Sequence, residues 1–333
     1  MLHIGVIGCG AIGRDHIRRL HDLVPNAQVV ACADYFQPAA EQVAAQYGIT
    51  AYPSGEALIA ASEVEAILIA SSDPSHAGYV LECLAHGKYV FCEKPLAQNA
   101  ADCEQIMAAE QAHGKRLVQV GFMRRYDRGY AEMKRIIDSG ELGAPLMIHA
   151  CHRNVSQPDG FQTEMGVSNV AIHELDICRW LLGDEYKSGQ VLKVRQSAES
   201  TKGYDNPQIV LLETQTGCRI DVEVQVADAY GYDIQCQVVC ERGTVNLPDP
   251  YAVIKRAGAS RSYPLLTDWK DRFIEAYDIE LTQWVQSVLD GKLTGPSSWD
   301  GYVACVAADA LNRSRGTGVF HPIETIDKPA LYQ

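Results

Sequence analysis

Three glycines near the start of the chain have the spacing of a phosphate-binding turn. The stretch MLHIGVIGCGAIGRDH places Gly8, Gly10 and Gly13 in a G-x-G-x-x-G pattern between an apolar run and a helical stretch. The first glycine permits a tight turn, the second lets a pyrophosphate approach the backbone, and the third lets helix and strand pack closely. The helix N-terminus at Ala11 and Ile12 adds unpaired N–H groups that attract negative charge. The pattern predicts a nucleotide-binding turn.

An acidic residue ends the second apolar run, AQVVACAD. Asp34 lies 21 residues (34 − 13) after Gly13, which completes the Rossmann dinucleotide-binding fingerprint. Its carboxylate can accept hydrogen bonds from both hydroxyls of an adenosine ribose, whereas a 2′-phosphate would face its negative charge. The next residues, Tyr35 and Phe36, supply no arginine. We therefore predict NAD rather than NADP as the cofactor; the alternative is a glycine turn with only a structural role.

A lysine follows the fourth apolar run, in KYVFCEKPLA. Glu93, Lys94 and Pro95 come at the carboxyl end of this predicted strand, the edge at which open α/β sheets bind ligands. A lysine there is less solvated than one on a helix surface, so it can serve as a proton partner or as a donor to a hydroxyl. Pro95 restricts the backbone of Lys94 to an extended conformation. The alternative is an ordinary salt bridge with Glu93.

Polar residues recur on one face of an otherwise apolar helix. In SNVAIHELDICRWLLG, a spacing of i, i+4, i+7 and i+11 aligns Asn169, His173, Asp176 and Trp180. A histidine between an amide and a carboxylate suits general acid–base catalysis near neutral pH. Asp176 can orient the ring or bind substrate hydroxyls. The alternative is a histidine with only a packing role in the core.

Further polar residues come at the same edge and on the next strand. The fifth apolar run is followed by three candidates, Met123, Arg124 and Arg125, although surface salt bridges are an alternative role for the arginines. In PLMIHACHRN (145–154), His152 and Asn154 share one face. His149 and His152 point to opposite faces and make a poor pair of metal ligands, so we predict no metal site.

The elements that must position these residues alternate over the first third of the chain. Apolar runs cover 2–8, 27–34, 66–71, 88–94 and 116–122, and helical stretches cover Ile12–Leu23, Pro38–Tyr47, Pro74–His86 and Ala100–His113. Strands that are apolar throughout, each followed by a helix, indicate a parallel sheet covered on both faces.

The pattern changes near residue 121. Helices are predicted at Asp127–Ser139, Ser168–Leu182, Asp268–Leu289 and Asp300–Arg315, with a strand at 145–154. Between Val191 and Ala257, period-two runs predict an antiparallel sheet with one face open to a neighbour; they include VLKVRQSAES (191–200) and YAVIKRA (251–257). The predicted class is therefore α/β. A Rossmann NAD-binding domain covers 1–120, and an α+β domain on an open, mainly antiparallel sheet covers 121–333 for substrate binding and oligomerisation.

Composition limits the partners and the compartment. The 333 residues carry a net charge of −13, which disfavours nucleic acid and anionic membrane surfaces as partners. No apolar run reaches the roughly 18 residues of a membrane span, and no basic leader precedes the first strand. Eleven scattered cysteines without a C-x-x-C motif predict buried, reduced thiols in a cytoplasmic protein.

Together these features resemble the glucose–fructose oxidoreductase and inositol dehydrogenase family (Gfo/Idh/MocA). The resemblance rests on the strand–GxGxxG–helix start, Asp34, E-K-P at 93–95, the His173 helix and the open antiparallel sheet, and covers essentially the whole chain. E-K-P is highly specific when it follows a Rossmann start. The segments GFMRRYDRGY, H-E-L-D-x-x-R-W-L-L and AYGYDIQC resemble the inositol dehydrogenase branch more closely than the sugar branches.

The resemblance implies NAD-dependent oxidation of a cyclitol secondary alcohol to a ketone, with myo-inositol as the first candidate. It implies that Lys94 and His173 act with an aspartate four residues before the histidine, and that position is Asn169 here. An amide can bind a hydroxyl but cannot accept a proton, so we expect His173 to be the general base and Lys94 to polarise the reacting oxygen.

The resemblance also implies the contacts of both ligands. The residues matching the substrate pocket are Lys94, Met123, Arg124, His152, Asn154, Asn169, His173, Asp176, Tyr232 and Tyr277. Those matching the cofactor site are Gly8, Gly10, Ala11, Ile12, Gly13, Asp34, Tyr35, Ser72, Pro74, His76, Glu93 and Lys94.

Other functions remain open from the sequence. One is a dehydrogenase of another polyol, such as scyllo- or chiro-inositol, an inosamine or an aldose, and Asn169 points that way. A second is a non-catalytic NAD-binding sensor, which the presence of Lys94 and His173 disfavours; a third, a structural subunit without cofactor, is disfavoured by the fingerprint. The open sheet predicts a homo-oligomer, and the family suggests a homotetramer built as a dimer of dimers.

Overall fold

The computed structural model describes residues 1–197, 203–250 and 253–333. Parts of two predicted strands, 198–200 and 251–252, lie outside the described residues. The described chain forms two compact units. The first contains Met1–Phe122, Tyr277–Cys305 and Thr325–Gln333, and the second contains Met123–Ala276 and Val306–Glu324.

This division differs from the single boundary expected between 1–120 and 121–333. Two stretches of the last third, Tyr277–Cys305 and Thr325–Gln333, belong to the N-terminal unit. The reason is hydrophobic burial, because Leu281 and Trp284 of α9 are fully buried in the same core as the first strand. Helical periodicity shows that a helix has a covered face but not which sheet covers it.

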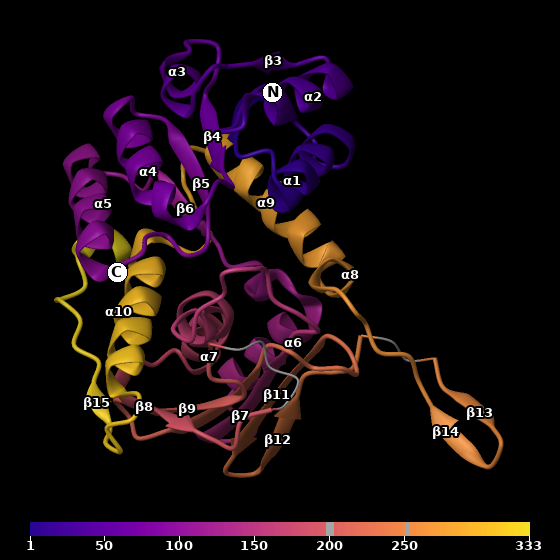
Figure 1. Ribbon diagram of the computed structural model, residues 1–333. Coiled ribbons are helices and arrows are strands. Elements are labelled where there is room, and N and C mark those ends of the chain that lie inside the picture. Colours follow the sequence, from indigo (N-terminus) through magenta and orange to yellow (C-terminus); the bar gives the residue numbers. More distant parts are fainter. Residues whose placement is uncertain (198–202, 251–252) are drawn as a thin grey trace. The chain divides into compact units, whose positions relative to one another are not determined.

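The first unit is built on a six-stranded parallel sheet with the order β3-β2-β1-β4-β5-β6. Figure 1 labels β3, β4, β5 and β6 of this sheet. Its strands are β1 (Leu2–Ile7), β2 (Ala27–Ala33), β3 (Thr50–Ala51), β4 (Ala66–Ile69), β5 (Tyr89–Glu93) and β6 (Val118–Gly121). The order reverses at β1, which pairs with both β2 and β4. Ligands bind at such a switch point, outside the carboxyl ends of the strands.

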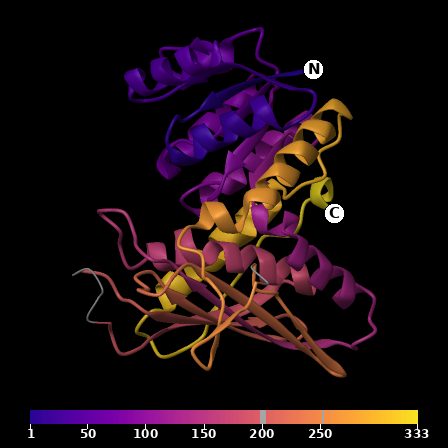
Figure 2. The ribbon, with the colours of Figure 1, turned by 90° about the vertical axis from the view of Figure 1, so that its right-hand side faces the viewer.

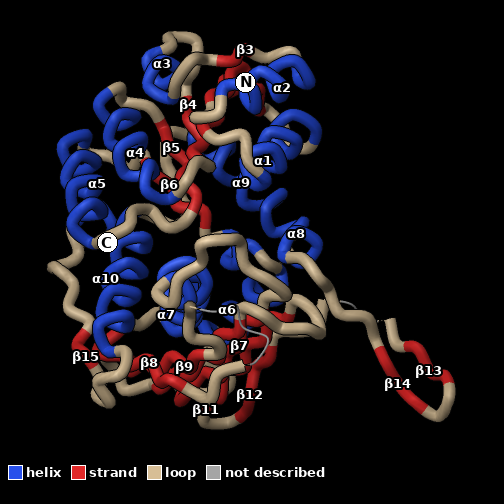
Figure 3. The backbone as a smooth tube through the Cα atoms, in the orientation of Figure 1, coloured by secondary structure: helices blue, strands red, loops and turns tan. Residues whose placement is uncertain are grey.

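Helices surround this sheet (Figure 3). They are α1 (Ala11–Asp22), α2 (Gln37–Tyr47), α3 (Gly55–Ala60), the 3₁₀ turn η1 (Asp73–Ser75), α4 (His76–Ala85), α5 (Ala100–His113), α9 (Ile274–Leu289), α10 (Ser298–Ser314) and the 3₁₀ turn η4 (Ala330–Tyr332). By residue, α9 begins in the second unit and α10 ends there. The alternating strands and helices confirm the predicted Rossmann architecture.

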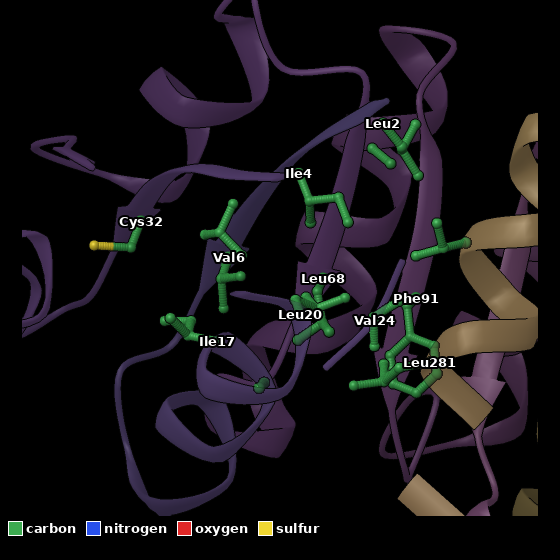
Figure 4. Packing of buried hydrophobic residues seen from close by; sticks show 14 of the residues in the cluster. Leu2, Ile4, Val6, Ile17, Leu20, Val24, Cys32, Leu68, Phe91 and Leu281 are labelled. Carbon is green, nitrogen blue, oxygen red and sulfur yellow. The ribbon is translucent and has the colours of Figure 1, made fainter. Parts of the chain in front are cut away.

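The core on one side of the sheet joins strands to α1 and α9 (Figure 4). Ile4 and Val6 of β1, Ile17 and Leu20 of α1, and Leu281 of α9 are each fully buried. Burying one such side chain stabilises the fold by about 1.5–3 kcal/mol relative to leaving it exposed. This apolar contact holds α1, and therefore the glycine turn before it, against the sheet.

The second unit is built on a seven-stranded sheet with the order β12-β11-β7-β10-β9-β8-β15. Its strands are β7 (Pro145–Arg153), β8 (Tyr186–Lys193), β9 (Gln208–Thr214), β10 (Arg219–Gln225), β11 (Asp233–Cys240), β12 (Gly243–Asn246) and β15 (His321–Pro322). All pairs are antiparallel except β7 with β10. Side chains alternate between buried and partly exposed along β9 and β10, as predicted for a sheet with one covered face.

Helices lie on one face of this sheet (Figure 2). The unit contains the 3₁₀ turn η2 (Met123–Tyr126), α6 (Arg128–Asp138), a π-helical segment η3 (Gly166–Ala171), α7 (Ile172–Leu182) and the short α8 (Trp269–Arg272). A separate hairpin pairs β13 (Lys255–Ala257) with β14 (Ser260–Ser262). The fold class predicted from the sequence, a Rossmann domain plus a domain on an open, mainly antiparallel sheet, is confirmed.

Two predicted helices differ in detail. The stretch predicted as one helix from 168 to 182 is α-helical only from Ile172, because Gly166–Ala171 forms π-helix. A π-turn contains more residues than an α-turn, so α-helical spacing does not describe the relation of Asn169 to His173. The helix predicted over 268–289 is interrupted at Phe273 between α8 and α9.

All eleven cysteines are buried, as the sequence predicts, and none of them forms a disulfide. Within the described part of the chain, no helix combines the length and apolar character needed to cross a membrane.

Candidate active site

The glycine turn between β1 and α1 is closely packed at two of its three glycines. Gly8 has a φ of +103°, and a Cβ there would lie 2.3 Å from the carbonyl oxygen of Ala70. A Cβ at Gly13 would lie 1.9 Å from the carbonyl oxygen of Gly8, whereas one at Gly10 would meet nothing within 4 Å. The chain itself therefore requires Gly8 and Gly13, while Gly10 leaves open space where a pyrophosphate can approach.

Helix α1 begins at this open position without a side-chain cap. Its N-cap residue is Gly10, which has no side chain to accept the first backbone N–H groups of the helix, such as those of Ala11 and Ile12. Uncapped N–H groups and the positive end of the helix dipole favour a bound anion. The turn therefore fits the pyrophosphate of NAD.

Asp34 follows β2 and is held against the glycine turn. Its carboxylate accepts the backbone N–H of Cys9 at 2.6 Å and that of Phe36 at 2.8 Å. A carboxylate has about four acceptor positions, so two backbone bonds leave room for ribose hydroxyls. The neighbouring Tyr35 side chain is fully exposed. These contacts fit the predicted role of Asp34 toward an adenosine ribose.

His76 connects the loop after β4 with the E-K-P segment. Its Nδ1 lies 2.7 Å from the carbonyl oxygen of Pro95, and its Nε2 lies 3.2 Å from that of Ser71. The ring is buried, whereas Ser72 and Pro74, the other predicted cofactor contacts of this loop, are exposed. The structure thus brings two predicted cofactor-binding segments together through one imidazole.

Lys94 directly follows β5 and is half-buried. Its backbone N–H donates to Glu93 Oε2 at 3.3 Å, and the Lys94–Pro95 peptide bond is cis. Glu93 is itself buried. Within the first unit, several predicted residues lie at or just beyond the carboxyl ends of the neighbouring strands β1, β2, β4 and β5: Gly8, Gly10, Gly13, Asp34, His76, Glu93 and Lys94.

A buried cluster of charged side chains joins η2, β7 and α7 in the second unit. Arg124 and Glu174 form an ion pair, with side chains only 1% and 2% exposed. His152 Nδ1 lies 3.1 Å from Arg124 Nη2 and 2.9 Å from Glu174 Oε2. Burial acts to raise the pKa of Glu174, but Arg124 and His152 outweigh it and hold that pKa below its ordinary value. The cluster keeps Arg124 and His152, both predicted substrate residues, in fixed positions.

His152 also contacts His173 and Tyr232. Its ring centroid lies 6.0 Å from that of each, tilted by 43° to His173 and nearly perpendicular to Tyr232. All three side chains are buried, and burial raises the pKa of Tyr232 to about 12. Tyr232 therefore remains a neutral hydroxyl near neutral pH. Three of the predicted substrate residues are thus brought together within the second unit.

Asp176 forms a two-bond ion pair with Arg125. Arg125 Nε donates to Asp176 Oδ2 at 2.9 Å, Nη2 donates to Oδ1, and the Asp176 side chain is 1% exposed. Both residues are candidates from the sequence, but their pairing was not predicted, and Glu174 was not a candidate. The sequence carries one hint of these pairs: it has two consecutive arginines after the fifth apolar run and two carboxylates on an otherwise apolar helix. Charged side chains are rarely buried without a partner, so each group needs an opposite charge nearby.

The remaining predicted substrate residues lie in different surroundings. Asn169 belongs to the π-helical segment, and its Oδ1 accepts the Ser168 hydroxyl at 3.1 Å. Met123 is buried at the start of η2, and Asn154 follows β7. Tyr277 belongs to the first unit, where its ring packs 5.6 Å from the His16 ring. Among the residues with described positions, no group of three potential ligands is arranged to hold a metal ion.

Comparison with known proteins gives matches over the whole chain. Residues 2–122 match the family model described as "Oxidoreductase family, NAD-binding Rossmann fold", and residues 130–246 match the "GFO/IDH/MocA C-terminal domain". Proteins named inositol 2-dehydrogenase from Burkholderia cenocepacia and Ralstonia nicotianae are 52% and 53% identical over 334 aligned residues. Each alignment covers 100% of this chain and 99% of the relative.

The fold also matches solved structures. The myo-inositol dehydrogenase of Lactobacillus casei, solved with NAD(H) and myo-inositol, superposes with a TM-score of 0.96 at 37% identity, with complete coverage of both chains. A structure from Sinorhizobium meliloti described as a myo-inositol dehydrogenase gives a TM-score of 0.87 at 27% identity over 97% of this chain and 100% of that one.

Proposed function

The chain belongs to the Gfo/Idh/MocA oxidoreductase family, and we propose that it oxidises myo-inositol to 2-keto-myo-inositol with NAD. The family resemblance predicted from the sequence is confirmed. The observation that carries the substrate is the identity of about half of all residues, over the full length, with proteins named inositol 2-dehydrogenase. The substrate residues implied by the resemblance are consistent with this assignment.

The cofactor of this family is NAD, and the chain has the residues to hold it. The glycine turn and the N-terminus of α1 receive the pyrophosphate, and Asp34 receives the adenosine ribose. When bound, NAD would supply the acceptor for the hydride that leaves the carbinol carbon. The carboxylate of Asp34 disfavours the 2′-phosphate of NADP.

The proton of the reacting hydroxyl is assigned to His173. In the proposed mechanism the imidazole accepts this proton as the carbon–oxygen double bond forms, which is the role of a general base. Lys94 Nζ donates a hydrogen bond to the same oxygen and stabilises the negative charge that develops there. Both roles are proposals that rest on the family match and on the residue chemistry.

Recognition of the other hydroxyls is assigned to the buried polar residues of the second unit. Arg124 and His152 are held by Glu174, and Tyr232 offers a neutral hydroxyl. A polyol presents paired donors and acceptors, and fixed partners reject stereoisomers that leave buried polar groups unpaired. The fixed cluster therefore supports a stereospecific cyclitol substrate.

A second candidate is a dehydrogenase of another cyclitol or polyol. It is favoured by Asn169, which replaces the aspartate that the family resemblance leads one to expect. An amide donates as well as accepts hydrogen bonds, so it can select a different hydroxyl arrangement. Scyllo-inositol, chiro-inositol, an inosamine and an aldose are the substrates to compare.

We propose further that the protein is a homotetramer, built as a dimer of dimers, and that it works in the cytoplasm. Its partner is a small polyol, and we expect neither nucleic acid nor a membrane as a partner. The second sheet supports the oligomer, because Met147 of β7 is an exposed apolar side chain on the same face as exposed His149. The net charge of −13 disfavours nucleic acid and anionic membranes as partners. The eleven buried thiols support a reducing compartment such as the cytoplasm.

The test is the initial rate of NADH formation, followed at 340 nm, with NAD and each member of the cyclitol panel. We expect myo-inositol to give the highest kcat/KM and NADP to support little activity. A higher kcat/KM for another polyol would replace myo-inositol by that substrate. Binding of NAD with no absorbance change for any polyol would favour the non-catalytic sensor.

A further inference from the structure

A buried histidine of α1 contacts the glutamate that precedes Lys94. His16 Nε2 lies 2.7 Å from Glu93 Oε1, and the His16 side chain is completely buried. The other carboxylate oxygen, Oε2, accepts the backbone N–H of Lys94 at 3.3 Å. The Glu93 carboxylate therefore links α1 to the first residue beyond β5.

The hydrogen bond to Glu93 is the polar contact that the described residues give to the His16 ring. Its Nδ1 is buried and has no hydrogen-bond partner in the described part of the chain, so the tautomer with a proton on Nε2 fits best and donates to Glu93. The rings of Phe91 and Tyr277 pack edge-on at 5.8 Å and 5.6 Å. These apolar neighbours keep water away, which strengthens the hydrogen bond to Glu93.

Strand β6 leaves space for the same carboxylate. Glu93 pairs with Gly121 in the register of β5 and β6. A Cβ at position 121 would lie 3.2 Å from both Cδ and Oε2 of Glu93, closer than ordinary van der Waals contact. Glycine is therefore favoured at 121 by the room that Glu93 needs, and α1, β5 and β6 together fix the carboxylate.

We propose that His16 and Glu93 form a positioning pair for Lys94. His16 fixes the Glu93 carboxylate, and that carboxylate holds the Lys94 backbone so that Nζ leaves the end of β5 in one direction. The inference rests on the proposed catalytic role of Lys94, and it adds a helix residue outside the G-x-G-x-x-G fingerprint to that role. Neither member of the pair exchanges a proton with the substrate.

The test compares two substitutions of His16. His16→Gln keeps an N–H donor that can reach Glu93, whereas His16→Leu fills the space without one. We expect His16→Leu to lower kcat about tenfold to a hundredfold, since a displacement of 1 Å at a reacting group costs up to about 10²-fold. The KM for NAD should change little, and His16→Gln should restore most of kcat. Gly121→Ala should lower kcat in the same direction, because it displaces the Glu93 carboxylate from the other side.

A buried carboxyl elsewhere in the first unit provides the matched control. Glu110 is fully buried and accepts hydrogen bonds from the backbone N–H groups of Leu117 and Val118 and from the hydroxyls of Ser298 and Tyr332. Glu110→Gln should lower the melting temperature while leaving kcat per folded enzyme close to the wild-type value. A loss of kcat in Glu110→Gln as large as in His16→Leu would overturn the proposal, because any loss of stability would then explain both.

A second readout does not depend on turnover. The acetylation rate of the Lys94 amine, measured by mass spectrometry against exposed Lys115, reports how the side chain is presented. We expect His16→Leu to change this rate roughly threefold or more and His16→Gln to restore it, in line with a displaced side chain. Unchanged rates and unchanged kcat in His16→Leu would overturn the positioning pair. Inactivity of the wild type toward every polyol would instead overturn the proposed function, and the acetylation rates would still decide the role of His16.

Discussion

The carboxylate of Asp34 accepts the backbone N–H of Cys9 at 2.6 Å, which ties the end of β2 to the middle of the glycine turn. The residue predicted to select the cofactor therefore also supports the turn that binds it. A substitution at Asp34 removes two functions at once, and a test of cofactor choice has to separate them.

Two variants of Asp34 make that separation. Asp34→Asn keeps an acceptor for the Cys9 N–H but removes the charge, whereas Asp34→Ala removes both. Hydrogen bonds to a charged group contribute about 1.5–3 kcal/mol, so each variant should lose roughly 10- to 100-fold in kcat/KM with NAD. The ratio of kcat/KM for NADP to that for NAD should rise in both. An unchanged ratio in Asp34→Asn would show that the carboxylate does not select the cofactor.

The proposed chemistry predicts large losses of turnover at Lys94 and His173. Lys94→Ala and His173→Ala should each lower kcat roughly 10²–10⁴-fold, the usual contribution of a positioned acid or base. NAD should still raise the melting temperature of both variants, because neither change removes the glycine turn. Lys115→Ala and His86→Ala change residues of the same types and serve as controls. A loss of less than about tenfold in either main variant would remove that residue from the mechanism.

The buried pair of Arg124 and Glu174 predicts a defined response of stability to acid. The pKa of Glu174 is held below its ordinary value of 4.5 by Arg124 and His152, despite burial. A carboxyl with a depressed folded-state pKa stabilises the protein fully above its unfolded pKa and loses this contribution as the pH falls through the folded value. Below about pH 4.5, the free energy of unfolding should therefore fall more steeply in the wild type than in Glu174→Gln.

At neutral pH the same pair should tolerate double replacement better than single replacement. Glu174→Gln leaves the Arg124 charge buried without its carboxylate, which costs about 3–5 kcal/mol when a buried pair is broken. Arg124→Met combined with Glu174→Met removes both charges and should be less destabilising than either single change. Urea unfolding of the wild type, Arg124→Met, Glu174→Met and the double variant measures this; additive losses would mean that the two residues do not act as a pair.

The first sheet and the cofactor turn could be predicted because their signals are local. The apolar runs at 2–8 and 88–94 correspond to β1 and β5, and the acid at 34 follows β2 directly. Strand β3 was not predicted, since Thr50–Ala51 is only two residues long and lacks an apolar run. Local patterns therefore predict most of the Rossmann unit, including the glycine turn and Asp34, whereas the proposed cofactor contacts of Ser72, Pro74 and His76 come from the family resemblance.

Long-range pairings could not be predicted in the same way. The ion pairs of Arg124 with Glu174 and of Arg125 with Asp176 join residues about fifty positions apart, and no periodicity connects them. The contact of His16 with Glu93 could not be predicted for the same reason, although His16 follows the glycine turn and Glu93 belongs to E-K-P. The π-helical segment could not be predicted either, because the helix at 168–182 was predicted from α-helical periodicity.

Asn169 stands where the family resemblance implies an aspartate, and its effect on specificity can be measured. In the structure it belongs to the π-helical segment immediately before α7, and its Oδ1 accepts the hydroxyl of Ser168. Asn169→Asp replaces an amide that donates and accepts by a carboxylate that only accepts. The variant should therefore change the ranking of kcat/KM across the cyclitol panel, because substrates that offered an acceptor at this point lose a partner. A site that uses a polar substrate contact discriminates by factors of up to about 10⁴–10⁵, so even a partial role should be visible.

Ser168→Ala, which removes only the neighbouring hydroxyl, is the control. An identical ranking in Asn169→Asp and the wild type would mean that Asn169 does not contact the substrate, and the preference for one cyclitol would then rest on the cluster of Arg124, His152 and Tyr232.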